Sequence, residues 1–228
     1  MKILSGLCLA ACAAFVLPSR AELLTAAPGG ATVIDFAQFT EQQVVGAGVQ
    51  VGGSVGTDVF LSAIGDHRIG PGEGFEVGLN GAWARTAVYN NDNLEGSFTF
   101  NFNTAPVAWV GGFVNYAPGF SPTVLLQTLD SAGNVTETWD LVTAAPISTP
   151  NGVDAGAFRG ISRSAADIYG FRVSYSYAVL DDLSFSTTPV PEPAGYALMS
   201  LGLMGLAFCV RRRRRSTPST LKTDTTQG

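Results

Sequence analysis

The sequence predicts an all-β domain over residues 22–189, built as a two-sheet β-sandwich or jelly roll. Apolar and polar residues alternate with a period of two at Phe98, Phe100 and Phe102, which predicts a strand with one buried face. Four further runs are rich in the aromatic and β-branched residues that favour strands: 107–116, 123–129, 135–141 and 171–177. Since no long stretch carries the apolar stripe of an amphipathic helix, about ten short strands fit this region best.

Turn-forming residues separate the strand-like runs. Residues 130–134, Asp-Ser-Ala-Gly-Asn, lie between two such runs and predict a hairpin loop. The last runs of the region, 157–161, 168–173 and 178–185, are similar to the final strands of jelly-roll modules in bacterial surface and lectin-like proteins. This resemblance supports the predicted jelly-roll fold and says little about function.

Residues 1–21 have the pattern of a secretory signal peptide. Lys2 supplies a positive charge, and the apolar run 3–17 follows it. Beyond a helix-breaking proline, Ser19 and Ala21 place small residues at the two positions that signal peptidase reads. We expect the mature chain to begin at Glu22, after export across the inner membrane.

A second processing site is present within the same segment. Residues 9–12, Leu-Ala-Ala-Cys, have the form of a lipoprotein box, in which Cys12 would be acylated and become the first residue. Against this alternative, residues 13–17 are apolar and continue the hydrophobic run.

The C-terminal region, 190–215, predicts a short transmembrane helix. Residues 194–210 carry no formal charge, and a run of this length is near the lower limit for crossing a bilayer. A basic cluster follows it and should stay in the cytoplasm: Arg211, Arg212, Arg213, Arg214 and Arg215. This topology puts the β domain on the outer side of the membrane, in agreement with the N-terminal export signal. The remainder, 216–228, is expected to be a polar cytoplasmic tail.

Three residues before the apolar run, Pro191, Glu192 and Pro193, complete a specific pattern. The order Pro-Glu-Pro, transmembrane stretch, arginine cluster resembles the PEP-CTERM sorting signal of Gram-negative bacteria that make exopolysaccharide. The resemblance implies that exosortase, a membrane protease, recognises and processes the segment. Since each proline disfavours helix, the motif should be extended and accessible just outside the membrane. The tail beyond Arg215 departs from the family pattern.

The charge of the chain is unevenly divided. The whole chain has a formal charge of −5, whereas residues 22–189 hold sixteen acidic and five basic residues, a formal charge of −11. Such a domain is not expected to bind nucleic acid. It also lacks cysteine, because the three cysteines are Cys8, Cys12 and Cys209, so no disulfide can stabilise it.

The pair Asp181-Asp182 is the candidate metal site. Alternation along the strand puts Asp181 on the face of Val179, Leu183 and Phe185, which we expect to be the core face. A buried carboxylate needs hydrogen bonds or a cation. In related jelly rolls a structural Ca²⁺ can lie between the first and last strands, which would make Asp35 the partner of Asp181 and Asp182. The alternative is a bulge or strand end at which both carboxylates are solvated or cap backbone N–H groups.

Two sequence patterns resemble parts of catalytic sites, but neither is sufficient to predict an enzyme. Residues 52–56, Gly-Gly-Ser-Val-Gly, match a nucleophile elbow, but no helix pattern follows them. The only histidine, His67, is expected to be a polar loop residue, although Asp66 beside it could support general-base chemistry. We assign no catalytic residue, and no cofactor beyond the candidate calcium.

Most aromatic residues of the domain are expected to fill its core. Trp83 and Tyr89 lie beside the polar stretch 90–93, which makes them the best candidates for exposed rings that stack on sugars.

The sequence therefore predicts a non-enzymatic surface protein. After a single-pass membrane intermediate, exosortase would process it for the cell envelope, outer surface or extracellular matrix. One alternative is a glycan-binding, lectin-like module of the exopolysaccharide matrix. A second is a carboxylate-dependent polysaccharide hydrolase.

Overall fold

The structure is a computed structural model that describes residues 21–91, 96–175, 177–190 and 201–205. The chain divides into two units, Met1–Val190 and Pro191–Gly228. In the second unit the described residues, 201–205, are helical. The first unit contains the β domain.

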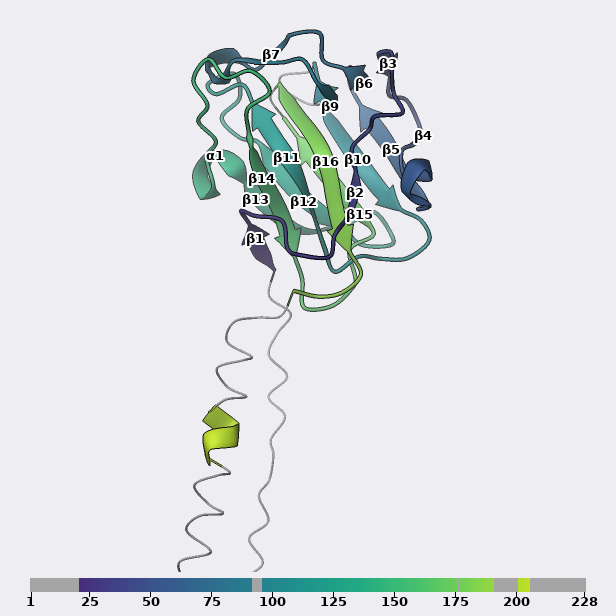
Figure 1. Ribbon diagram of the computed structural model, residues 1–228, viewed down its shortest axis with the longest axis vertical. Helices are drawn as coiled ribbons and strands as arrows, with labels where there is room; N and C mark the ends of the chain where they lie inside the picture. The colour runs from purple at the N-terminus through teal and green to yellow at the C-terminus, as the bar shows by residue number, and fades with distance from the viewer. Residues whose placement is uncertain (1–20, 92–95, 176, 191–200, 206–228) are drawn as a thin grey trace, which may run out of the picture. The chain divides into compact units, whose positions relative to one another are not determined.

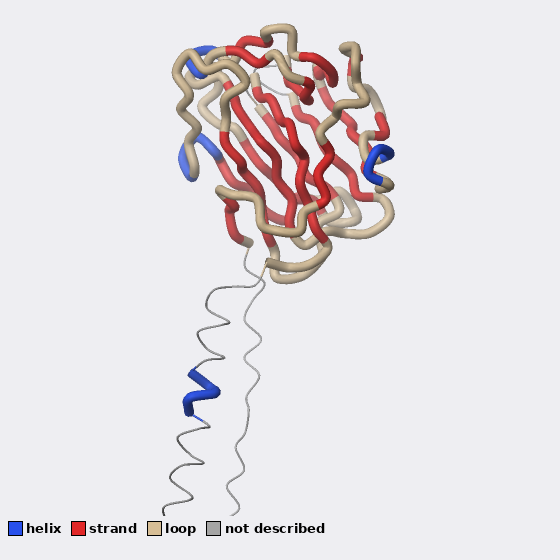
Figure 2. Tube along the Cα trace, viewed as in Figure 1, coloured by secondary structure: helices blue, strands red, loops and turns tan. Residues whose placement is uncertain are grey.

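Short strands dominate the described part of the first unit, with two 3₁₀ turns and one helical turn among them (Figure 2). The elements are β1 (Glu22–Leu24), β2 (Thr32–Ile34), β3 (Gln43–Val44), β4 (Val49–Gln50), η1 (Gly53–Val55), β5 (Val59–Ile64), β6 (His67–Pro71), β7 (Phe75–Glu76), η2 (Gly78–Asn80), β8 (Ala82–Trp83), β9 (Thr86–Asn90), β10 (Ser97–Phe102), β11 (Trp109–Tyr116), β12 (Leu125–Leu129), β13 (Val135–Asp140), α1 (Leu141–Ala144), β14 (Ala157–Ser162), β15 (Gly170–Ser174) and β16 (Ala178–Ser186). The predicted all-β class is confirmed.

The strands form two large antiparallel sheets (Figure 1). The eight-stranded sheet has the order β1-β14-β11-β16-β9-β6-β3, with β2 pairing with β16. The six-stranded sheet has the order β13-β12-β15-β10-β5-β4. From β9 onward, the orders β9-β16-β11-β14 and β10-β15-β12-β13 are jelly-roll-like, because the chain passes repeatedly from one sheet to the other.

One buried cluster joins the two sheets. Phe98 and Phe100 of β10 are fully buried, and Phe102 is nearly so, as their alternation predicts. The ring of Phe100 stacks on Phe36 at 5.9 Å between centroids. The ring of Phe102 meets Phe185 of β16, in the opposite sheet, at 5.1 Å. Burial of these rings from both sheets is the main force that holds the domain together.

A second, smaller apolar cluster lies apart from this core. Its buried members are Val77, Trp83, Ala87, Tyr89 and Val179, and Phe75 and Phe113 pack against them. The β7–β8 hairpin and its connection supply Phe75, Val77 and Trp83, while β9, β11 and β16 supply the other four residues from the eight-stranded sheet. The hairpin thus covers part of that sheet on the face that carries Val179.

The predicted hairpin loop at 130–134 is confirmed. Strands β12 and β13 pair on either side of it. Oδ1 of Asp130 accepts hydrogen bonds from the backbone N–H groups of Ala132 and Asn134, and the Asn134 amide donates to Oδ2. These bonds to the charged form lower the pKa of the Asp130 carboxyl. A glycine with φ of 80°, Gly133, completes the turn.

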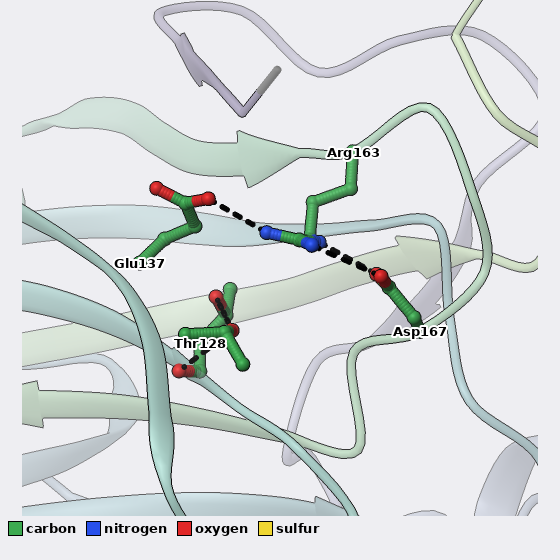
Figure 3. Close-up of polar contacts among 5 residues, drawn as sticks. Thr128, Glu137, Arg163 and Asp167 are labelled. Atoms are coloured by element: carbon green, nitrogen blue, oxygen red, sulfur yellow. Dashed lines mark hydrogen bonds and ion pairs between the residues drawn. The ribbon is translucent and has the colours of Figure 1, made fainter. Parts of the chain in front are cut away.

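An ion-pair network joins the two sheets at one edge of the domain (Figure 3). Arg163, directly after β14, donates from Nε and Nη2 to both carboxylate oxygens of Asp167, at 2.6 and 3.0 Å. Its Nη1 donates to Glu137 of β13 at 2.7 Å. Since Arg163 is mostly buried and both of its partners are partly exposed, we interpret this network as structural support.

Most residues of the predicted signal peptide and of the predicted membrane helix lie outside the described residues. Of the predicted signal peptide, 1–21, the structure describes Ala21 alone, which packs against the main core directly before β1. The predicted membrane helix, 194–210, is described at 201–205 only. None of the helices in the described part of the chain is long and apolar enough to span a bilayer.

Candidate functional site

The outer side of the eight-stranded sheet carries a buried carboxylate. Asp181 of β16 is buried, and its Oδ2 lies 3.0 Å from Nη2 of Arg85. The Arg85 guanidinium also lies over the rings of Trp83 and Phe113, at 5.1 and 5.7 Å from their centroids. Arg85 is held in place by Asp154, whose Oδ1 accepts its backbone N–H at 3.0 Å.

A β-bulge in β16 determines which way Asp181 faces. The pairing of β11 with β16 shifts between Gly111 and Phe113, and Asp182 has a φ of 50°. As a result, Leu180 and Leu183 both belong to the main core, whereas Asp181 lies on the face of Val179. The expectation that Asp181 shares a core face with Leu183 and Phe185 is therefore wrong, because strict alternation ends at the bulge.

Burial decides the protonation of Asp181. Loss of solvent, followed by the negative charge of Asp182, raises the pKa of Asp181 to about 7. The backbone N–H of Asp182, which donates to Oδ1 at 2.7 Å, and the Arg85 guanidinium act in the opposite direction. The charge of Asp35 adds a smaller upward effect. Asp181 therefore titrates near neutral pH in the folded domain.

The three aspartates of the predicted calcium site are neighbours, but their contacts are to protein groups. Asp35 is exposed, and its Oδ1 accepts the backbone N–H of Ala37. Asp181 contacts the Arg85 guanidinium, which supplies the positive charge that a cation would bring. Within the described residues, no group of three or more His, Cys, Asp or Glu side chains is arranged to hold a metal ion. Calcium at Asp35, Asp181 and Asp182 stays a prediction from the sequence, and the contact of Asp181 with Arg85 weighs against it.

The predicted sugar-stacking pair is wrong. Trp83 has no exposed surface and Tyr89 is 2% exposed, because both belong to the smaller apolar cluster. The Trp83 ring packs on Phe113, and the Tyr89 ring packs on Phe75 at 5.0 Å. Burial raises the pKa of Tyr89 to about 12. Neither ring can therefore stack on a sugar.

The two sequence patterns that resemble catalytic sites, at Asp66-His67 and at residues 52–56, form ordinary parts of the β domain. His67 belongs to β6 and is fully buried against the edge of Phe98, so it is not a loop residue. Asp66 contacts Arg68 at 3.7 Å. Within residues 52–56, Gly53–Val55 form the 3₁₀ turn η1, in place of the strand-turn-helix that a nucleophile elbow needs.

The outer face of the six-stranded sheet carries a row of polar side chains. A register row crosses five strands and joins Ser62, Thr99, Arg172, Gln127 and Thr138. Asn101 lies beside this row, and its amide donates to Ser62 Oγ at 3.1 Å. We call these six residues the polar face. Thr99 and Asn101 alternate with the buried phenylalanines of β10, so the sequence already places them on this side.

Hydrogen bonds within the polar face hold its side chains in position. Nε of Arg172 donates to Thr99 Oγ1 at 3.2 Å, and the Gln127 amide donates to Thr138 Oγ1 at 3.2 Å. These bonds link neighbouring strands, so the donors and acceptors form a regular array.

A pocket of about 520 Å³ adjoins the polar face. Asn101 belongs to both, and the hairpin loop that contains Asp130 forms another wall of the pocket. Tyr169, which is 38% exposed, contributes an aromatic ring to the lining. At Gly170 a Cβ would lie 2.9 Å from Leu129, so glycine lets the Leu129 side chain pack against the sheet here.

A second pocket, of about 410 Å³, lies between the η2 region and the loops after β11 and α1. Its lining is mainly apolar and includes Leu79, Pro118 and Pro150. Asn80, at its base, is buried and donates to Asn115 Oδ1 and to the carbonyls of Tyr116 and Ile147. The amide ties three segments together, which is a structural role.

The sorting residues Pro191, Glu192 and Pro193 and the five arginines from Arg211 to Arg215 lie outside the described residues. Their place in the chain is nevertheless defined, because the last strand, β16, ends at Ser186 and the motif begins directly beyond it.

Comparison with known families agrees with this arrangement. The model of the PEP-CTERM protein-sorting motif matches residues 189–214. No match was found to a curated protein or to a solved structure. The chain therefore carries a PEP-CTERM protein-sorting motif, which follows an all-β domain directly.

Proposed function

We propose that this chain is an exported surface protein that exosortase processes and whose β domain acts without catalysis. One observation carries the proposal: the sorting motif matches residues 189–214, directly after the last strand of a compact domain. Cleavage near Pro191–Pro193 would leave that domain intact with a short C-terminal extension. Signal peptidase would remove residues 1–21 first, and the membrane would hold the intermediate only transiently.

The charge of the domain supports a fate outside the membrane. Residues 22–189 have a formal charge of −11 and contain no lysine. With sixteen acidic and five basic residues, the domain is not expected to be held on anionic lipid. We therefore place the processed domain at the outer surface or in the extracellular matrix.

The composition of the pockets supports a role without catalysis. A glycosidase needs two carboxylates on either side of a substrate cleft. Among the described residues, Asp130 is the single carboxylate that lines the 520 Å³ pocket, and the lining of the 410 Å³ pocket has none. Asp181 lines neither, so the hydrolase alternative has no support from these sites.

Substitution of the motif tests the sorting proposal. The triple variant Pro191→Ala, Glu192→Gln, Pro193→Ala, produced in the native host, is expected to stay unprocessed in the membrane fraction. The variant Thr187→Ala, Thr188→Ala changes exposed residues just before the motif and is the control, expected to be processed as the parent protein is. Release of the triple variant at the parental rate would contradict the proposal.

Glycan binding is a second candidate function, and a specific observation favours it. Trp83 and Tyr89 cannot bind sugars because they are buried, but the polar face presents an ordered array of hydrogen-bonding groups beside a pocket that contains Tyr169.

A further inference from the structure

We propose that the polar face binds an extended, neutral hexose polysaccharide, with one end of the chain in the adjoining 520 Å³ pocket. This inference rests on the second candidate function and assigns it to particular residues. Three properties of the face support it: its charge, its hydrogen-bonding chemistry and its shape.

The first property is the near absence of carboxylates from a face of a strongly acidic domain. Three register rows cross this sheet, and their members are Ile64, Ser97, Ser174, Leu125 and Asp140; Ser62, Thr99, Arg172, Gln127 and Thr138; and Gln50, Phe60, Asn101, Gly170, Leu129 and Val135. Asp140 is the single carboxylate among them, and it accepts the backbone N–H groups of Val124 and Val142. The acidic residues of the domain therefore lie mostly elsewhere, and the one formally charged side chain of the central row is Arg172.

The second property is the mixture of donors and acceptors. Hydroxyl groups of Ser62, Thr99 and Thr138 both donate and accept, as do the amides of Asn101 and Gln127 taken as whole groups. Arg172 contributes a guanidinium whose Nε is already used by Thr99. Sugar hydroxyls also both donate and accept, so a polyhydroxylated chain can pair with the more exposed members of the array, whereas Thr99, which is 8% exposed, holds Arg172 in position. Since the side chains already bond to one another, little further ordering is needed on binding.

The third property is shape. The main row crosses five strands, which corresponds to about 19 Å at the usual spacing between strands. That length suits a short stretch of an extended polysaccharide. Beside the row, two residues further along β10 than Thr99, Asn101 borders the pocket, where Tyr169 offers an aromatic face and Asp130 a hydrogen-bond acceptor.

The same properties disfavour other occupants. A protein partner would need a desolvated apolar or aromatic centre, but the central row is polar throughout. A strongly anionic polymer would be repelled by the domain's formal charge of −11. A neutral polysaccharide needs no apolar centre and is not repelled by the charge of the domain.

Affinity electrophoresis of the mature protein tests the inference, with barley β-glucan, dextran and alginate each cast into a native gel. We expect at least one of the neutral polymers, β-glucan or dextran, to retard the protein, and alginate to leave its mobility unchanged. Asn101→Ala and Gln127→Ala should each lower the apparent affinity about tenfold, the effect of losing a hydrogen bond in a desolvated site. Gln43→Ala, an exposed glutamine in β3 of the other sheet, is the matched control and should bind as the parent protein does.

Thermal melts of each variant separate lost binding from lost folding. If an alanine variant melts early, Gln127→Glu replaces it, since this change keeps the side chain's shape and adds a charge that should also weaken binding. Retardation that survives both face variants would overturn the assignment of the site while leaving glycan binding intact. Failure of both neutral polymers to retard the parent protein, or retardation by alginate alone, would overturn the inference and count against the second candidate function. Neither result would bear on sorting.

Discussion

Nη2 of Arg85 lies 3.0 Å from Oδ2 of Asp181, and this contact joins a guanidinium that is 45% exposed to a carboxylate that is 6% exposed. The bulge at Asp182 turns Asp181 away from the main core and toward the smaller apolar cluster. The pair thus lies where the β7–β8 hairpin covers the eight-stranded sheet. A titratable group in this position should make the stability of the domain depend on pH.

Asp181 should lower stability as the pH rises toward neutral. Its pKa is about 7 in the folded domain, and an aspartate in an unfolded chain has a pKa of about 3.9. Between these values the folded state binds more protons than the unfolded state, so the free energy of unfolding falls with rising pH, by at most about 1.4 kcal/mol per pH unit. Urea unfolding across this range measures the slope.

The variant Asp181→Asn should remove this slope, because the amide cannot ionise yet still offers Arg85 an acceptor. Asp58→Asn makes the same chemical change at an exposed site and should leave the slope as in the parent protein. Equal slopes in the parent protein and in Asp181→Asn would show that Asp181 does not titrate in this range.

Trp83 should be important for stability. Trp83→Ala removes a fully buried ring from the smaller cluster and should cost about 3–5 kcal/mol of unfolding free energy. Phe120→Ala, at a ring that is 54% exposed, should cost no more than about 0.5 kcal/mol. Chemical denaturation measures both, and a small loss for Trp83→Ala would mean that the β7–β8 hairpin does not pack as described.

The Arg163 network should show measurable coupling. A double-mutant cycle of Arg163→Ala and Asp167→Ala should give a coupling energy of about 1 kcal/mol, because the guanidinium is mostly buried and makes two bonds to the carboxylate. The same cycle at Arg68 and Asp66 is the control. That pair is 3.7 Å apart and exposed, and its coupling should be near zero. Equal couplings in the two cycles would contradict a structural role for Arg163.

Calcium should have little effect on stability. Arg85 already supplies positive charge to Asp181, so we expect the same melting temperature with calcium and with EDTA. Differential scanning calorimetry decides the question. A melting temperature that rises with calcium, and does so less in Asp35→Asn, would instead establish the cation site predicted from the sequence.

The strand pattern could be predicted from sequence because it is local. The alternation at Phe98, Phe100 and Phe102 already specifies which face of β10 is buried, and the turn residues at 130–134 specify the hairpin. The sorting motif is similarly local, since its residues are contiguous.

The candidate sites were harder to predict because they depend on distant contacts. The bulge at Asp182 puts Asp181 on the face opposite to Leu183, and no residue in this run predicts that Asp182 has a φ of 50°. Trp83 is buried because a short hairpin folds over a sheet whose strands come from other parts of the chain. Likewise, the polar face exists only once five strands are in register, so Thr99 and Gln127 could not be joined from sequence alone.

Intact-mass analysis of the protein isolated from its native host tests the central claim, that exosortase processes this chain. The account predicts an N-terminus at Glu22 and a C-terminus near Pro191–Pro193, without Arg211–Arg215. A mass that retains those five arginines in the mature surface protein would contradict it.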